Sequence, residues 1–295
     1  MGRELAEKYP VAAATFKEAD EALEFAISQL CFEGPEDQLK MTAITQPAIL
    51  TASVATYRVL AEAGKQPDVV AGHSLGEYSA HVAAGTIQFA DAVRAVHKRG
   101  QFMQEAVPAG EGAMAAILSL DLARIEEACV TAQNETGGVV APANINSPDQ
   151  IVISGSATAV ARAAELAKEF GAKKTVMLPV SAPFHCKLMQ PAQDKLAAEL
   201  AKISFSDLRI PLVTNVDVEL VRTGDQSRDA LVRQVTGAVR WTESMQKLIT
   251  EGVERFVEVG PGTILCGLMR RIDRSRQCAN VGDEVSLAKT LEALA

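Results

Sequence analysis

The sequence predicts an α/β fold with a large, α/β-hydrolase-like subdomain, whose sheet is mostly parallel, and an inserted ferredoxin-like small subdomain. Three observations predict it. Short apolar runs are each followed by a turn and a helical pattern, which is typical of parallel sheets. The middle of the chain has the order β-α-β-β-α-β. A Gly-x-Ser-x-Gly pattern stands between a predicted strand and a predicted helix.

The large subdomain is predicted from apolar runs that are short enough to be buried strands. These runs cover residues 69–71, 210–216 and 256–259. Between them, apolar residues recur at helical spacing, as at Leu50, Val54 and Tyr57. That pattern follows Pro47, and proline suits the first turn of a helix, so we expect the helix to begin there.

The small subdomain is predicted from the segment between about 107 and 182. We expect strands at 113–120, 139–144, 150–154 and 174–179, and helices at 122–133 and 158–170. This order is that of a ferredoxin-like unit. The sequence therefore predicts a ferredoxin-like small subdomain at 107–182 and a hydrolase-like catalytic subdomain formed by 1–106 and 183–295.

The charge balance argues against a nucleic-acid partner, and the distribution of apolar residues argues against a membrane-spanning protein. The chain of 295 residues has 29 Lys and Arg against 37 Asp and Glu, a net charge of −8. Proteins that grip nucleic-acid phosphates have basic surfaces, so we expect no nucleic-acid partner. The sequence has no apolar run of about 18 residues that could cross a bilayer, and it opens without a secretory signal. We therefore expect a cytoplasmic protein without a membrane partner.

The cysteines give no recognisable pattern. There are five of them, an odd number, and no two have the Cys-x-x-Cys spacing. We therefore expect neither a disulfide framework nor a zinc site, and no metal. Such cysteine usage fits a reducing compartment.

The strongest chemical signal is Gly72-His73-Ser74-Leu75-Gly76. A nucleophilic serine on a tight strand-to-helix turn needs small neighbours two residues to either side, and glycine supplies them. The following helix points its free N–H groups at the serine, which favours a developing oxyanion. A five-residue pattern also arises by chance, but its position between strand and helix favours Ser74 as a nucleophile.

A serine nucleophile needs a base, and the chain has four histidines. His73 adjoins the serine in sequence, so its ring is poorly placed to face the hydroxyl. His81 and His97 fall in helical patterns, where packing or surface roles are common. His185 lies where the small subdomain rejoins the large one, and a returning loop could bring it over Ser74. Position alone makes His185 a candidate and leaves the assignment open.

Seven motifs together resemble the malonyl-CoA:acyl carrier protein transacylase family. The first is GHSLGEYSA at 72–80. The others are TQPA at 45–48, RGQFMQ at 99–104, NSPDQIVISG at 146–155, SAPFH at 181–185, RQ…RWT at 233–242 and EVGPG at 258–262. They follow the family's order along almost the whole chain, and their combination is far more specific than any one of them.

The resemblance implies a two-step acyl transfer. In the family, a serine takes the malonyl group from malonyl-CoA and passes it to the phosphopantetheine thiol of acyl carrier protein. Ser74 matches this nucleophile, and His185 matches the general base. The backbone carbonyl of Gln234 matches the group that orients the histidine, and the backbone N–H of Leu75 matches one oxyanion donor. No bound cofactor is implied besides the substrate malonyl-CoA, and we expect a monomer that supplies fatty-acid synthesis.

The resemblance also implies residues that bind the substrate. Arg99 matches the residue that holds the malonyl carboxylate, for which a planar guanidinium is well suited. From spacing alone, Arg99 also fits a solvated residue in a charged run. Phe184 stands where a ring could crowd a branched acyl group. Three further residues are expected to line the pocket: His73, Asn146 and Gln46. Asn146 and Gln46 fit a turn or a helix cap equally well.

One departure from the family leaves other functions open. The family begins with a buried strand and a Gly-Gln-Gly-Ser-Gln loop that supplies a second oxyanion donor, whereas this sequence begins at the next helix. The family's first strand is therefore expected to be missing. One alternative is a catalytically impaired acyltransferase that acts as a binding module. Another is a serine esterase or thioesterase, although such hydrolases place a histidine late in the chain and none follows residue 185 here.

Overall fold

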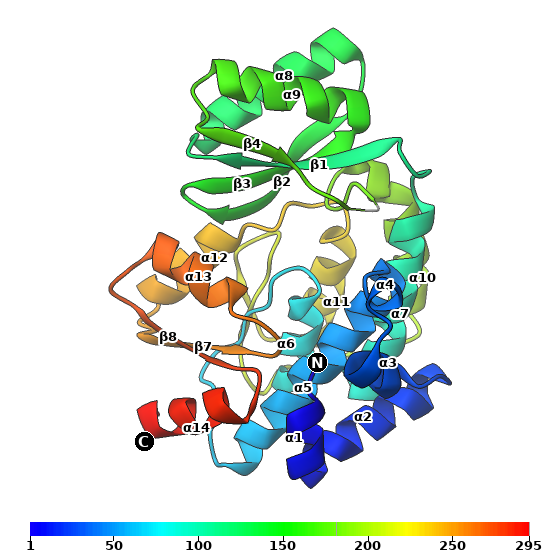
Figure 1. Ribbon diagram of the computed structural model, residues 1–295, viewed down its shortest axis with the longest axis vertical. Helices are drawn as coiled ribbons and strands as arrows, with labels where there is room; N and C mark the ends of the chain where they lie inside the picture. The colour runs from blue at the N-terminus through cyan, green and yellow to red at the C-terminus, as the bar shows by residue number, and fades with distance from the viewer. Residues whose placement is uncertain (181, 295) are drawn as a thin grey trace.

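The computed structural model describes residues 1–180 and 182–294. Ser181, which belongs to one of the quoted motifs, and Ala295 lie outside the described residues. The chain folds into a lower body of helices around small sheets and an upper layer made of a four-stranded sheet with two helices (Figure 1). The predicted α/β class and the ferredoxin-like insertion are confirmed, whereas the boundaries at 106/107 and 182/183 stay a prediction.

The first third of the chain is helical. Its helices are α1 (Arg3–Lys8), α2 (Pro10–Leu23), α3 (Ile27–Glu33), α4 (Glu36–Leu39), α5 (Thr42–Glu62), α6 (Gly76–Ala84) and α7 (Phe89–Glu105). Helix α5 is buried on most of its surface and packs against α2 and α7 in the main hydrophobic core. A helix that is apolar on nearly all sides belongs in a core, and α5 forms the support on which α6 rests.

Helix α5 does not begin at Pro47, as the sequence predicted, but at Thr42. A proline inside a helix removes one N–H donor and leaves the carbonyl four residues earlier without its partner. Here that carbonyl belongs to Ala43, and the ring Nδ1 of His97 on α7 donates to it at 2.8 Å. This contact between helices satisfies the freed carbonyl, and it also gives His97 a structural role.

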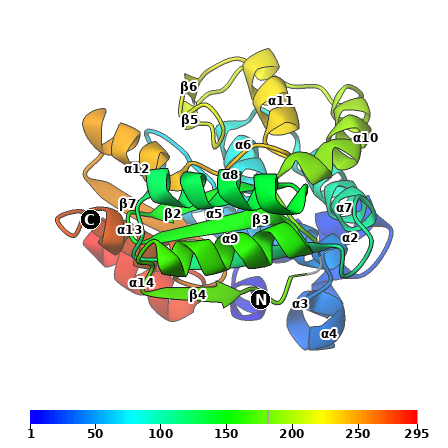
Figure 2. The same ribbon diagram turned by 90° about the horizontal axis from the view of Figure 1, so that it is seen from above.

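The small sheet has the predicted order of elements. These are β1 (Gly112–Leu118), α8 (Leu122–Thr136), β2 (Val140–Ser147), β3 (Gln150–Ser156), α9 (Ala157–Glu169) and β4 (Lys174–Met177). The strands lie in the order β2-β3-β1-β4, and all neighbours are antiparallel. Helices α8 and α9 cover one face (Figures 1 and 2), where a core of small and branched apolar residues fills the space. The other face lies toward α12 (Trp241–Thr250) and α13 (Ile264–Ile272).

The remaining elements complete the lower body. They are the short 3-10 helix η1 (Lys187–Met189), α10 (Gln190–Leu200), β5 (Leu212–Val213), β6 (Leu220–Val221), α11 (Gly224–Arg233), β7 (Arg255–Val259), β8 (Gln277–Val281) and α14 (Glu284–Ala293). The parallel sheet is smaller than the sequence predicted. Strands β7 and β8 are parallel, β5 and β6 are antiparallel, and the predicted strand at 69–71 makes a single parallel bridge from Val70 to Leu212.

The free edge of β2 is paired with a segment of the lower body. Ile145 donates its backbone N–H to Val239 at 2.9 Å, and Val239 donates to Ala143 at 2.8 Å. The hydroxyl of Thr242 also donates to the Ile145 carbonyl at 3.0 Å. These backbone bonds join the small sheet to the segment between α11 and α12, and they bring the end of β2 against the turn that carries Ser74.

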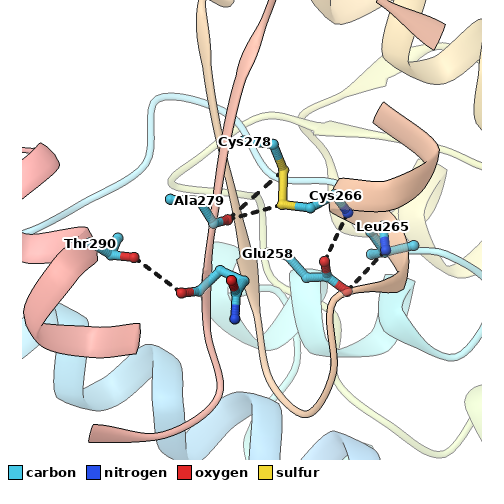
Figure 3. Close-up of a disulfide and its surroundings, with 7 residues drawn as sticks. Glu258, Leu265, Cys266, Cys278, Ala279 and Thr290 are labelled. Carbon is cyan, nitrogen blue, oxygen red and sulfur yellow. Dashed lines mark hydrogen bonds between the residues drawn. A yellow bond between two sulfur atoms is a disulfide. The ribbon is translucent and has the colours of Figure 1, made fainter. Parts of the chain in front are cut away.

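The cysteine prediction is wrong at one pair. Cys266 on α13 and Cys278 on β8 form a disulfide, with Cα atoms 5.4 Å apart (Figure 3). Beside it, the carboxylate of Glu258 accepts the backbone N–H groups of Leu265 and Cys266 at the start of α13. The pair has no motif spacing, because the packing of α13 against β8 brings the two positions together. The other three cysteines are buried thiols.

In the part of the chain that the structure describes, no helix is both long enough and apolar enough to span a membrane.

Candidate active site

The predicted nucleophile lies on a strained turn between the Val70 bridge and α6. Ser74 has φ 51°, a left-handed conformation that non-glycine residues rarely adopt and that is often found at functional sites. A Cβ on Gly72 would lie 2.0 Å from the carbonyl of Gly76, so the turn requires glycine at position 72. A Cβ on Gly76 would meet no atom within 4 Å. The expected need for a small residue therefore holds at Gly72 and not at Gly76.

The structure brings Ser74 and His185 together across 111 positions of sequence. The Oγ of Ser74 lies 2.7 Å from Nε2 of His185. The other ring nitrogen, Nδ1, lies 2.9 Å from the backbone carbonyl of Gln234. A carbonyl can only accept, so Nδ1 carries the hydrogen and Nε2 presents its lone pair to the serine hydroxyl. This tautomer is the one that a general base requires.

His185 is neutral in this setting. Its side chain is almost completely buried, and burial lowers its pKa to about 3, with the positive charge of Arg99 as the next cause. The Gln234 carbonyl acts in the opposite direction, but it is uncharged and does not offset the burial. The ring is therefore ready to accept a proton at neutral pH without first losing one.

Arg99 is buried, so the alternative of a solvated side chain is wrong. It projects from α7 with 2% of its surface exposed. Its Nη1 donates to Oε1 of Gln46 at 2.6 Å, and its Nη2 donates to Oε1 of Gln234 at 2.9 Å and to Oγ of Ser74 at 3.2 Å. These acceptors are neutral. A buried guanidinium whose hydrogen bonds go to neutral acceptors, next to a serine hydroxyl, is suited to hold a carboxylate.

Glu77 on α6 is a site residue that the sequence analysis missed. Its side chain is fully buried, and its Oε2 accepts from Nε2 of Gln234 at 2.7 Å and from the backbone N–H of Asn215 at 3.2 Å. Burial raises the pKa of Glu77 to about 7, against the effect of these hydrogen bonds and of Arg99. Its position three residues after Ser74, on the buried face of the next helix, was the available signal.

Gln234 and Asn215 complete the surroundings of the turn. The side-chain Nε2 of Gln234 donates to the Ser74 carbonyl at 2.9 Å, in addition to its bond to Glu77. Asn215 follows β5 and bonds to the backbone on both sides of His73. The resemblance pointed only to the Gln234 carbonyl. A polar residue inside the apolar run 210–216 was the signal for Asn215.

The remaining predicted residues lie around this centre. Nε2 of His73 lies 2.8 Å from Oδ1 of Asn146 at the end of β2, and its ring lies 5.5 Å from that of Trp241. Leu75 is buried and directly precedes α6. Phe184 is half-buried and packs against both the main core and a cluster under the small sheet. The described residues contain no group of three or more His, Cys, Asp or Glu side chains that could hold a metal ion.

Comparison with known proteins gives the family. Residues 1–290 match the model of the acyl transferase domain. The malonyl CoA-acyl carrier protein transacylase of Escherichia coli K12 is 52% identical over 293 residues, which cover 99% of this chain and 94% of that protein. The corresponding protein of Bacillus subtilis is 47% identical over 295 residues, 100% of this chain and 92% of that protein.

Solved structures give the same result. An acyl carrier protein S-malonyltransferase from Vibrio cholerae superposes with a TM-score of 0.96 at 48% identity, over 98% of this chain and 94% of that one. A malonyl-transacylase solved in complex with a type II PKS acyl-carrier protein has a TM-score of 0.96 at 47% identity, over 99% and 94% of the two chains. The fold is that of an acyltransferase domain. Within that class, the chain belongs to the malonyl CoA-acyl carrier protein transacylase family.

Proposed function

We propose that this chain transfers the malonyl group from malonyl-CoA to the phosphopantetheine thiol of acyl carrier protein, through a malonyl ester on Ser74. The observation that carries the proposal is the 2.7 Å contact between Ser74 Oγ and the unprotonated Nε2 of His185. We further propose that the reaction takes place in the cytoplasm and supplies fatty-acid synthesis. The high similarity to named transacylases supports this assignment.

In the first half-reaction, Ser74 Oγ attacks the thioester carbonyl of malonyl-CoA while Nε2 of His185 takes the hydroxyl proton. The tetrahedral oxyanion accepts a hydrogen bond from the backbone N–H of Leu75, at the positive end of α6. The carbon–sulfur bond then breaks, and His185 returns the proton to the coenzyme A thiolate. The Gln234 carbonyl holds the ring in its tautomer throughout, in the place that a carboxylate takes in other serine enzymes.

The second half-reaction reverses these roles. The phosphopantetheine thiol gives its proton to His185 as its sulfur attacks the malonyl ester. Ser74 Oγ leaves and takes the proton back from His185, so the enzyme is regenerated. The nearby Arg99 cation stabilises the departing alkoxide, since its Nη2 lies 3.2 Å from Oγ.

Arg99 is proposed to select the malonyl group. The guanidinium reaches Ser74 Oγ, and a malonyl carboxylate is separated from the acyl carbon by one methylene group, so the two ends of the acyl group can contact Arg99 and Ser74 together. Gln46 fixes the guanidinium from the other side. Phe184, His73 and Asn146 are proposed to line the acyl pocket. Acetyl groups lack the carboxylate, so they gain no binding contact with Arg99 beyond its effect on the Ser74 oxygen.

Intact-protein mass spectrometry tests the proposal. Incubation with malonyl-CoA is expected to add one malonyl group to the wild-type protein and none to Ser74→Ala. Subsequent addition of holo acyl carrier protein is expected to move the group to the carrier. A malonyl adduct that persists in Ser74→Ala would refute the nucleophile. Rapid loss of the adduct to water before the carrier is added would favour the thioesterase alternative.

A further inference from the structure

Asn215 makes two hydrogen bonds to the turn that carries the nucleophile. The side chain is completely buried. Its Oδ1 accepts the backbone N–H of Ser74 at 2.7 Å, and its Nδ2 donates to the backbone carbonyl of Gly72 at 2.7 Å. One carboxamide thus bonds to the peptide groups on both sides of His73, in the way that a neighbouring strand would.

The turn needs such a partner. Ser74 is held at φ 51°, so its N–H and the Gly72 carbonyl do not continue the pairing that Val70 makes with Leu212. Without Asn215, the buried Gly72 carbonyl and the partly buried Ser74 N–H would lose this partner, which is unfavourable. Asparagine offers one acceptor and one donor at a fixed separation. Alanine offers neither, and aspartate offers two acceptors.

Asn215 is itself fixed from two other directions. Its backbone N–H donates to Oε2 of Glu77 at 3.2 Å, and its carbonyl accepts from the backbone N–H of Arg240 at 3.0 Å. The same Glu77 oxygen accepts from Gln234, whose carbonyl orients His185. Glu77 therefore links Asn215, which bonds to the Ser74 turn, to Gln234, whose carbonyl orients His185.

We propose that Asn215 is a positioning residue that holds the Ser74 turn in its strained shape and thereby sets Oγ within reach of His185. The inference rests on the proposed function, in which Ser74 is the nucleophile. It makes a specific prediction. Loss of Asn215 slows attack by Ser74 on any electrophile, whether or not that electrophile has a carboxylate that Arg99 can bind.

The test compares Asn215→Ala and Asn215→Asp with Thr290→Val. Thr290 is almost as deeply buried as Asn215, and its hydroxyl donates to the Asn280 carbonyl between α14 and β8, away from the turn. Two rates are measured for each folded protein: malonyl transfer, and labelling of Ser74 by a small fluorophosphonate that has no carboxylate. Melting temperatures establish that each variant is folded at the assay temperature.

In Asn215→Ala, we expect kcat for malonyl transfer and the rate of fluorophosphonate labelling to fall together by about 100-fold, because a displacement of about 1 Å has that effect on a positioned nucleophile. KM is expected to change less than about twofold. Asn215→Asp keeps the acceptor for Ser74 but sets a carboxylate oxygen against the Gly72 carbonyl, so both of its rates also fall. Thr290→Val is expected to keep both rates.

Wild-type labelling rates in folded Asn215→Ala would overturn the positioning role. A rise in KM with unchanged labelling would also overturn it, since Asn215 would then act on the substrate. If the wild-type protein reacts with the fluorophosphonate but not with malonyl-CoA, the proposed function is wrong, and the labelling comparison still decides the role of Asn215.

Discussion

The proposed nucleophile, Ser74, and the proposed base, His185, lie within hydrogen-bond distance of each other. The Gln234 carbonyl fixes the ring tautomer, burial keeps His185 neutral, and Arg99 donates to the serine oxygen that receives negative charge. Because a carbonyl carries no full charge, it stabilises the imidazolium less than a carboxylate would. The stabilisation of charge in this site therefore depends more on Arg99 and the end of α6 than on the partner of the histidine.

Arg99→Ala is expected to reduce malonyl transfer far more than acetyl transfer. The substitution leaves the malonyl carboxylate without its cation, and truncation of one member of a buried charge pair costs about 2 kcal/mol or more, at least roughly 30-fold in kcat/KM. Arg99→Lys is expected to recover little, since Gln46 and Gln234 engage two separate nitrogens of the guanidinium. Steady-state rates with malonyl-CoA and acetyl-CoA give the comparison. Equal losses for both substrates would contradict a carboxylate-binding role.

At the scale of elements, the turn between Val70 and α6 depends on close packing of the Gly72 backbone against the backbone of Gly76. Gly72 passes so close to the first residue of α6 that no side-chain carbon fits between them. The strained φ of Ser74 follows from this path, because the chain must reverse at once from extended to helical backbone. The two glycines of the motif consequently have different physical roles.

Gly72→Ala and Gly76→Ala form a matched pair that tests this distinction. The first places a Cβ 2.0 Å from backbone atoms of Gly76, so the turn must move, and we expect a lower melting temperature and at least about 100-fold slower malonyl transfer. The second places a Cβ in open space at the start of a helix, where alanine is favoured over glycine by up to about 1 kcal/mol. Its melting temperature is expected to be unchanged or higher. Thermal melts and transfer rates check both, and similar damage from the two substitutions would contradict the account.

The helices and strands of the small subdomain were predicted to within a few residues because their signals are local. Asp121 caps α8 through its side chain, and Gly137 ends the same helix in a left-handed conformation. The small parallel sheet of the large subdomain was overestimated, because apolar runs such as 210–216 indicate burial without specifying a strand. The start of α5 was wrongly predicted at Pro47. The helix accommodates this proline because His97, which is distant in sequence, bonds to the carbonyl that the proline leaves free.

At the scale of the molecule, the site is formed by segments that only the complete fold brings together. The resemblance located Ser74, His185 and Arg99, but no local pattern identifies Gln234 and Asn215 as partners of Glu77. The Cys266–Cys278 disulfide was missed for the same reason. Long-range packing also determines burial, so the pKa values of the histidines could not be derived from the sequence.

Burial of histidine makes the stability of the whole molecule depend on pH. His81 on α6 is completely buried, and neither of its ring nitrogens has a hydrogen-bond partner among the described residues. Burial lowers the pKa of His81 to about 3, as it does that of His185, from an ordinary value of 6.5. Between these values the unfolded chain binds protons that the folded chain does not, so stability is lost as the pH falls below 6.5.

Glu77 opposes this trend, because its pKa is raised from 4.5 to about 7 and the folded chain holds its proton more tightly over that range. Burial also lowers the pKa of His73. Three histidines against one carboxyl leave a net loss of stability on acidification between pH 6.5 and 4.5, with a contribution of at most about 1.4 kcal/mol per pH unit from each group. His81→Leu removes one of the three histidines without touching the site. We expect its melting temperature to fall less than that of the wild-type protein between pH 7 and pH 5, and to exceed the wild-type value at pH 5. Calorimetry at several pH values measures both, and parallel curves would show that His81 is not a buried neutral histidine.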